Sequence, residues 1–178
     1  ETDILALLDA AEEEIIFAMH HFNRPPLRRA LVAAANRGLR VAGVIPESDR
    51  GTNRFAISGA TVRYFANPNL YTGTNRVHLL PARVNAVGPA LDSGQPDLVH
   101  LKYALVDPSG PRPVVIHGAA NWTASGLTSP AGNDESTLFL RHAGIARAFL
   151  EQFHCMTGTA TAPPSAPTQP EVSALLPP

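Results

Sequence analysis

The sequence predicts an α/β fold in which helices and strands alternate, and three observations point to it. Residues 2–13 and 27–37 are rich in helix-forming residues, whereas residues 14–20 and 39–45 are short apolar runs typical of buried strands. The connections between these four segments are short. Because two strands joined by a crossover helix normally pair in parallel, this order predicts an α/β sheet.

The ends of the first two helices carry recognisable signals. Thr2 or Asp3 can cap the first helix, which extends through about residue 13. Pro25 and Pro26 suit the first turn of the second helix, and Gly38 is placed where a helix commonly ends. These signals support the order helix, strand, helix, strand.

The middle of the chain predicts less regular structure. Residues 49–59 are expected to form a polar loop and a short helix, and residues 60–65 alternate well enough to predict a third strand. Residues 66–97 contain seven glycine or proline residues, which predict a long loop. Loops of this length in compact domains are typically lids or substrate walls.

The C-terminal half predicts a hairpin, a further strand and a last helix. Residues 98–106 and 114–117 are expected to pair across a turn at 107–113, and residues 136–140 form another strand. Residues 145–156 have the apolar spacing of an amphipathic helix. Its expected inward-facing residues are Ile145, Phe149, Leu150 and Phe153.

Length and composition indicate one globular domain with a tail. The 178 residues are 44% hydrophobic and 16% charged, as in soluble globular proteins. The domain is expected over residues 1–157, and residues 158–178, rich in Ala, Thr, Ser and Pro, are predicted to be a linker or disordered tail. A net charge of -1 removes the simplest argument for a nucleic-acid-binding protein, but a local basic groove remains open.

One basic residue differs in type from all the others. Lys102 is the only lysine, so the other thirteen of the fourteen basic residues are arginine. His100 lies two residues earlier, on the same face of the predicted strand, with about 7 Å between the Cα atoms. A neutral imidazole can attack phosphorus while an ammonium holds a non-bridging oxygen. Asp107 falls on the opposite face and is expected to anchor the end of the strand.

Further polar residues follow in an order that suits the same chemistry. Asn121 comes after a tight turn at Gly118 and could donate to a phosphate, and Glu135 could fix the tautomer of a nucleophilic histidine. His20 ends a strand where a parallel sheet opens to ligands. We assign His20, Gly118 and Trp122 to the substrate side of the site, with packing beside the site as the alternative for Trp122.

The run His100-Leu101-Lys102-Tyr103-Ala104-Leu105-Val106-Asp107, followed by Gly-x-x-Asn-Trp-Thr and Asn-x-Glu, resembles the signature of the phospholipase D superfamily. The resemblance extends in element order over about residues 4–153. It implies an α/β/α sandwich with a mixed, largely parallel sheet flanked by helices. It also implies a covalent phosphohistidine at His100, with Lys102 and Asn121 on the phosphate. Ala119 departs from the family, which often has serine there.

The resemblance also assigns the remaining roles. Glu135 takes the place of the acid that supports the histidine, and Asp107 that of the structural acid of the motif. No cofactor and no metal are implied, and the seven histidines show no metal-ligand spacing.

The leading functional hypothesis is a hydrolase that cleaves, or transfers, a phosphodiester, with a phospholipid as the favoured substrate. An endonuclease acting on DNA or RNA is the first alternative, because the superfamily contains compact endonucleases with one motif per chain. A non-catalytic half that pairs with another motif-bearing domain is the second alternative. The intact set of motif residues disfavours that second alternative.

A single motif predicts a partner. The leaving oxygen needs a proton from a second histidine, which a homodimer mate or another half of the same polypeptide could supply. The sequence contains no transmembrane segment, so a soluble chain is expected. Because the sequence begins with Glu1, a removed signal peptide with export and a missing first half both stay open.

Overall fold

The computed structural model describes residues 1–46, 57–81, 100–129, 132 and 134–159. The strands are β1 (Glu14–Met19), β2 (Arg40–Val44), β3 (Val77–Leu79), β4 (Lys102–Val106), β5 (Val114–Gly118) and β6 (Thr137–Leu140). The helices are α1 (Thr2–Asp9), α2 (Pro25–Asn36), α4 (Gly59–Ala66), α5 (Ala124–Leu127), α6 (Ala143–Thr157) and the 3-10 helix η1 (Pro68–Leu70).

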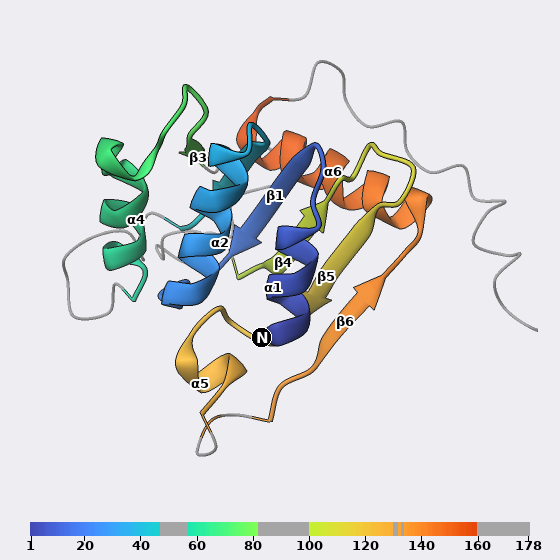
Figure 1. Ribbon diagram of the computed structural model, residues 1–178. Helices are drawn as coiled ribbons and strands as arrows, with labels where there is room; N and C mark the ends of the chain where they lie inside the picture. Colours follow the sequence, from blue (N-terminus) through green and yellow to red (C-terminus); the bar gives the residue numbers. More distant parts are fainter. Residues whose placement is uncertain (47–56, 82–99, 130–131, 133, 160–178) are drawn as a thin grey trace, which may run out of the picture.

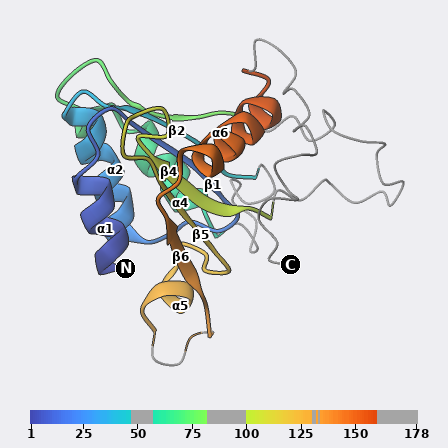
Figure 2. The same ribbon diagram turned by 90° about the vertical axis from the view of Figure 1, so that its right-hand side faces the viewer.

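The described strands form one six-stranded sheet in the order β3-β2-β1-β4-β5-β6. Helices α1 and α2 cover one face of the sheet and α6 covers the other (Figures 1 and 2). The predicted fold class, a mixed sheet flanked by helices, is confirmed.

Parallel pairing is confined to one side of the sheet. β1 pairs with β2 and β2 with β3 in parallel, as the crossover through α2 predicts. The pairs β1–β4, β4–β5 and β5–β6 are antiparallel, so the sheet is less parallel than expected. The short turn between β4 and β5 explains part of this result, because a tight turn can only join antiparallel strands.

The central strand β1 supplies side chains to both layers of the core. All six of its residues are buried, which is why it reads as a continuous apolar run. Ile15, Phe17 and Met19 pack toward α1 and α2, whereas Ile16 and Ala18 pack with residues of α6. The site-bearing end of β1 is therefore fixed from both faces.

The strand predicted over residues 60–65 is wrong, because these residues form helix α4. Thr61 and Phe65, four residues apart, are both buried on the inner side of the helix. Thr61 donates its hydroxyl to the carbonyl of Phe22, and the Phe65 ring packs against Phe17 and Phe22. These tertiary contacts outweigh the local β propensity that suggested a strand.

Several other expectations need correction or fall outside the described residues. The long loop over 66–97 contains η1 and β3, and its residues 82–97 lie outside the described part, as do residues 49–56, 98–99 and 160–178. Ile145 is 36% exposed and does not face inward, whereas Phe153 is buried. Within the described ranges, no helix is long and apolar enough to cross a bilayer.

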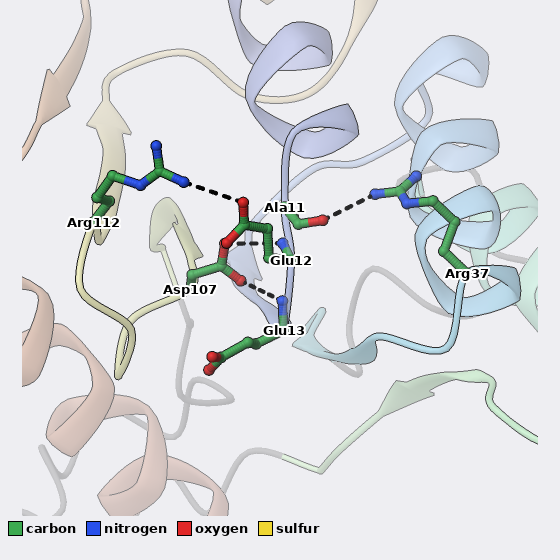
Figure 3. A network of polar contacts seen from close by, with 6 residues as sticks. All are labelled: Ala11, Glu12, Glu13, Arg37, Asp107 and Arg112. Atoms are coloured by element: carbon green, nitrogen blue, oxygen red, sulfur yellow. Dashed lines mark hydrogen bonds and ion pairs between the residues drawn. The ribbon is translucent and has the colours of Figure 1, made fainter.

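Asp107 ties the end of β4 to the chain that enters β1 (Figure 3). Its Oδ1 accepts hydrogen bonds from the backbone N–H groups of Glu13 and Glu14 at 2.8 and 2.9 Å, and its Oδ2 from that of Glu12 at 3.0 Å. Its own N–H donates to the carbonyl of Glu14 at 2.8 Å. The expected role of Asp107 as an anchor at the strand end agrees with these contacts.

The backbone conformation at position 107 is a second reason for an Asp at this position. It has a φ of 46°, in the left-handed region that Asp and Asn tolerate better than other side chains. Arg112 and Glu12, which lie beside it, form an exposed ion pair of 3.1 Å that contributes little to stability.

We expect Asp107→Ala to lower the free energy of unfolding by about 3 kcal/mol, because three backbone N–H groups lose a charged acceptor and alanine disfavours a positive φ. Asp107→Asn keeps an acceptor oxygen and should lose less. Urea denaturation measures both, with the exposed neighbour Ser109→Ala as the control. Equal stability of the alanine variant and the wild type would contradict this role.

Candidate active site

His100 and Lys102 meet at the start of β4. The Lys102 Nζ lies 3.1 Å from the Nε2 and 3.2 Å from the Nδ1 of His100. Lys102 is 9% exposed, whereas His100 is exposed and precedes the paired part of the strand. A lone pair of a neutral imidazole can accept from the ammonium, so the contact suits a neutral histidine beside a fixed positive charge.

A pocket of about 430 Å³ opens at this pair. Four of the sequence-predicted catalytic residues line it together, and four further positions come from the same strand ends and loops. The lining residues are His100, Leu101, Lys102, His117, Gly118, Ala119, Asn121 and Glu135. Segments separate in sequence therefore converge on one site.

The side chain of Asn121 is oriented by the end of β1. Its Oδ1 accepts from the backbone N–H of His21 at 3.1 Å, and the next residue, Trp122, donates its N–H to the carbonyl of His21 at 3.0 Å. Because the amide oxygen is held by the chain, the amide NH₂ is the end of Asn121 that can serve an anion in the pocket.

Gly118 permits the close approach of β6 that brings Glu135 to the pocket. A Cβ at Gly118 would lie 2.0 Å from the carbonyl oxygen of Ser136, so no other residue fits without moving β6. Gly118 pairs with Thr137, and Ala119 donates its N–H to that same Ser136 oxygen at 3.0 Å. Glycine is therefore needed at position 118 because the chain at Ser136 packs directly against it.

The charges of the pocket favour a neutral His100. Burial lowers the pKa of His100, and the positive charges of Lys102 and His21 lower it further. Burial also lowers the pKa of Lys102, and the Glu135 carboxylate opposes that change. Glu135 therefore supports the ammonium electrostatically, while its expected role on the His100 tautomer stays a prediction.

Three of the residues assigned to the site do not line the pocket. Asp107 lies at the opposite end of β4, where it makes the contacts described above, so its place in the motif is structural and not catalytic. Trp122 is 2% exposed and packs on Phe17 and Phe22, with ring centroids 6.1 and 5.0 Å away. Its side chain belongs to the core, so the assignment to substrate binding is wrong and the packing alternative holds.

His20 contacts His100 and is not among the residues that line the pocket. The centroids of the two rings are 4.5 Å apart. The expected contact of His20 with substrate stays a prediction.

His117 is the pocket residue that the sequence reasoning missed. It lies on β5, and its Nδ1 is 3.2 Å from the carbonyl oxygen of Lys102. It pairs across the ladder with Tyr103, inside the motif. Its place immediately before Gly118 on the hairpin strand was the available signal. In the part of the chain that the structure describes, no group of three or more His, Cys, Asp or Glu could hold a metal ion.

Comparisons with known proteins agree with this arrangement. The family model described as "Cardiolipin synthase, PLD-like domain" matches residues 4–157. The phospholipase D family member Nuc from Salmonella typhimurium is 28% identical, with a TM-score of 0.63, over 87% of this chain and 84% of that one.

Two further solved structures share the fold at lower identity. NucT from Helicobacter pylori is 19% identical, with a TM-score of 0.65, over 87% of this chain and 85% of that one. Phosphatidylserine synthase from Haemophilus influenzae Rd KW20 is 14% identical, with a TM-score of 0.63, over 97% of this chain and 38% of that one. No curated protein sequence matches the chain significantly.

We expect Lys102→Met to raise the pKa of His100, because the variant removes a neighbouring positive charge and keeps a side chain of similar length. The neutral fraction of His100 at a given acidic pH should fall accordingly. NMR titration of the His100 ring protons measures the pKa, and the exposed His78 should titrate alike in both proteins. An unchanged His100 titration would contradict the electrostatic role of Lys102.

Proposed function

Because this chain belongs to the phospholipase D superfamily, we propose that it is a phosphodiesterase that hydrolyses or transfers a phosphodiester of a phospholipid through a phosphohistidine at His100. The observation that carries the proposal is the contact between the His100 imidazole and the Lys102 ammonium in a pocket that also holds Asn121 and Glu135.

The first step is a displacement at phosphorus. A lone pair of the neutral His100 ring forms the N–P bond, the bond from phosphorus to the leaving alkoxide breaks, and an acid protonates that oxygen. Lys102 and the NH₂ group of Asn121 stabilise the negative charge on the equatorial oxygens, which a fixed and partly buried donor does better than water.

The second step restores the enzyme. Water, or the hydroxyl of an acceptor alcohol, attacks phosphorus as a base removes its proton, and the N–P bond breaks. Water gives hydrolysis and an alcohol gives transfer. The lowered pKa of His100 suits both steps, because the ring starts and ends the cycle as a neutral base.

A phospholipid is favoured over a nucleic acid by two observations. The matching family model describes a domain of cardiolipin synthase, which is named for a lipid product. The net charge of -1 also provides no overall attraction to a polyanion. The endonuclease alternative is supported by the likeness to compact members of the superfamily, since the similarity extends over 84% of Nuc from Salmonella typhimurium.

Parallel assays distinguish these substrates. We would supply vesicles of phosphatidylcholine, vesicles of cardiolipin, single-stranded DNA, and bis-p-nitrophenyl phosphate as a generic diester, each with and without EDTA. The proposal expects lipid cleavage that exceeds DNA cleavage, is unaffected by EDTA and is abolished in His100→Ala. Preferred DNA cleavage would favour the endonuclease, and inactivity on every diester would favour a non-catalytic pairing half.

A second histidine is needed to complete the first step. His100 must be neutral to attack, while the leaving oxygen needs a protonated group on the far side of phosphorus, and one ring cannot do both at once. We propose that this acid comes from a second copy of the motif, in a homodimer or in another half of the same polypeptide. Both arrangements predict a bell-shaped dependence of the rate on pH.

We expect Lys102→Arg to be nearly as damaging as Lys102→Ala. Lys102 is buried against His100, and the larger planar guanidinium cannot place one compact charge at the same position. The loss of transition-state stabilisation should be on the order of 3 kcal/mol, roughly a hundredfold in kcat. Steady-state kinetics on the cleaved substrate measures it, and turnover of the arginine variant near that of the wild type would refute the argument.

If the second motif comes from a homodimer mate, inactive chains should inhibit active chains by forming mixed dimers with them. Adding an equal amount of His100→Ala chains under exchange conditions should reduce the activity of a fixed amount of wild type to about half, since random pairing leaves half of the active chains in mixed dimers. The exposed His78→Ala variant, mixed in the same way, is the control and should not inhibit. Full activity from a strict monomer of these 178 residues, which contain one motif, would contradict the two-motif mechanism.

A further inference from the structure

Two consecutive histidines follow β1 and lie beside the catalytic histidine. The ring centroids of His20 and His100 are 4.5 Å apart with an interplanar angle of 59°, and those of His20 and His21 are 3.7 Å apart with an angle of 35°. Both are half-buried, and neither is among the residues that line the pocket at His100.

The backbone holds both histidines in register with the site. His20 donates its N–H to the carbonyl of Leu101 at 2.8 Å, which extends the antiparallel pairing of β1 and β4 by one bond. His21 donates its N–H to Oδ1 of Asn121 at 3.1 Å. Because these contacts use main-chain atoms of the two histidines, their imidazoles can be replaced without removing the bonds.

We infer that His20 and His21 are positioning residues for His100, in which the His20 ring restrains the orientation of the His100 ring and the His21 side chain opposes a positive charge on it. This inference rests on the proposed function, because it gives His100 the part of nucleophile. It assigns chemistry to two residues that the motif does not include.

The orientation of His100 needs such a restraint. Its side chain is exposed and its backbone precedes the paired part of β4, so the strand alone does not fix the ring. Lys102 contacts the ring nitrogens, and His20 packs against the same ring. A nucleophile that must approach phosphorus in line loses rate steeply when its angle is free to vary.

The electrostatic part follows from the placement of the rings, because the centroid of the His21 ring lies 3.7 Å from that of His20, which lies 4.5 Å from that of His100. Lys102 and His21 both lower its pKa, Glu135 acts mainly on Lys102, and His117 faces the Lys102 carbonyl. A positive charge on one imidazole makes a positive charge on a neighbouring imidazole unfavourable.

The two residues should give different signatures when they are replaced. His21→Asn removes the charge, so the pKa of His100 should rise and the acidic limb of kcat/KM should move to higher pH, with little change in kcat at the optimum. His20→Ala should lower kcat by roughly tenfold with a smaller change in KM, because orientation is lost and not binding. His20→Phe keeps an aromatic ring and should recover most of that kcat.

NMR titration of His100 in the full chain tests the charge effect without any assay of activity. The wild type, His21→Asn and the exposed control His78→Asn would be compared, and only His21→Asn should shift the His100 titration upward. An unchanged His100 pKa in His21→Asn would overturn the charge role. A His20→Phe variant as slow as His20→Ala, with both folded by circular dichroism, would overturn the ring role.

These outcomes separate the inference from the proposed function. If the wild type cleaves no phosphodiester yet His21→Asn shifts the His100 titration, the proposed function fails while the electrostatic coupling stands. If the wild type cleaves a diester and neither histidine variant changes the His100 titration or kcat, the proposed function stands and the inference fails.

Discussion

The antiparallel pairing of β1 with β4 is the contact on which the rest of the structure depends. It joins the parallel half of the sheet to the antiparallel half, with Ile15 opposite Val106 at one end and Met19 opposite Lys102 at the other. Asp107 fastens the first end by binding the backbone that enters β1. The pocket lies at the other end, where β1 ends and β4 begins. Anchor and pocket are thus placed at opposite ends of one strand pair by the spacing of the motif.

The motif could be interpreted from sequence because its chemistry is local. His100 and Lys102 are two residues apart, and the turn that presents Asn121 begins at a glycine whose Cβ would collide with Ser136. The role of Trp122 was harder to infer, since an aromatic residue beside a catalytic amide suits a substrate wall and a core equally well. Its burial between Phe17 and Phe22 comes from long-range packing that no local pattern contains.

The absence of long-range contacts from local sequence patterns also explains the errors in the predicted fold. The parallel pair β1–β2 followed from the order of elements, and Gly38, with a φ of 98°, ends α2 as the sequence predicted. The segment that became α4 has β-branched and aromatic residues that favour a strand locally. It is helical because Thr61 and Phe65 contact Phe22, which lies about forty positions earlier in the sequence. Local propensity gave the wrong element there because tertiary contacts decide it.

The site combines a requirement for positive charge with a requirement for a neutral base. A phosphate needs Lys102 as a cation, yet that cation and the burial around it make a proton on His100 unfavourable. The conflict is resolved because both effects act in the same direction, toward a neutral nucleophile beside a permanent charge. The cost is that His100 cannot also supply the proton for the leaving oxygen at the same moment. Because the charges around His100 favour its neutral form, the proton for the leaving oxygen has to come from another group, and this is the physical reason for proposing a second motif.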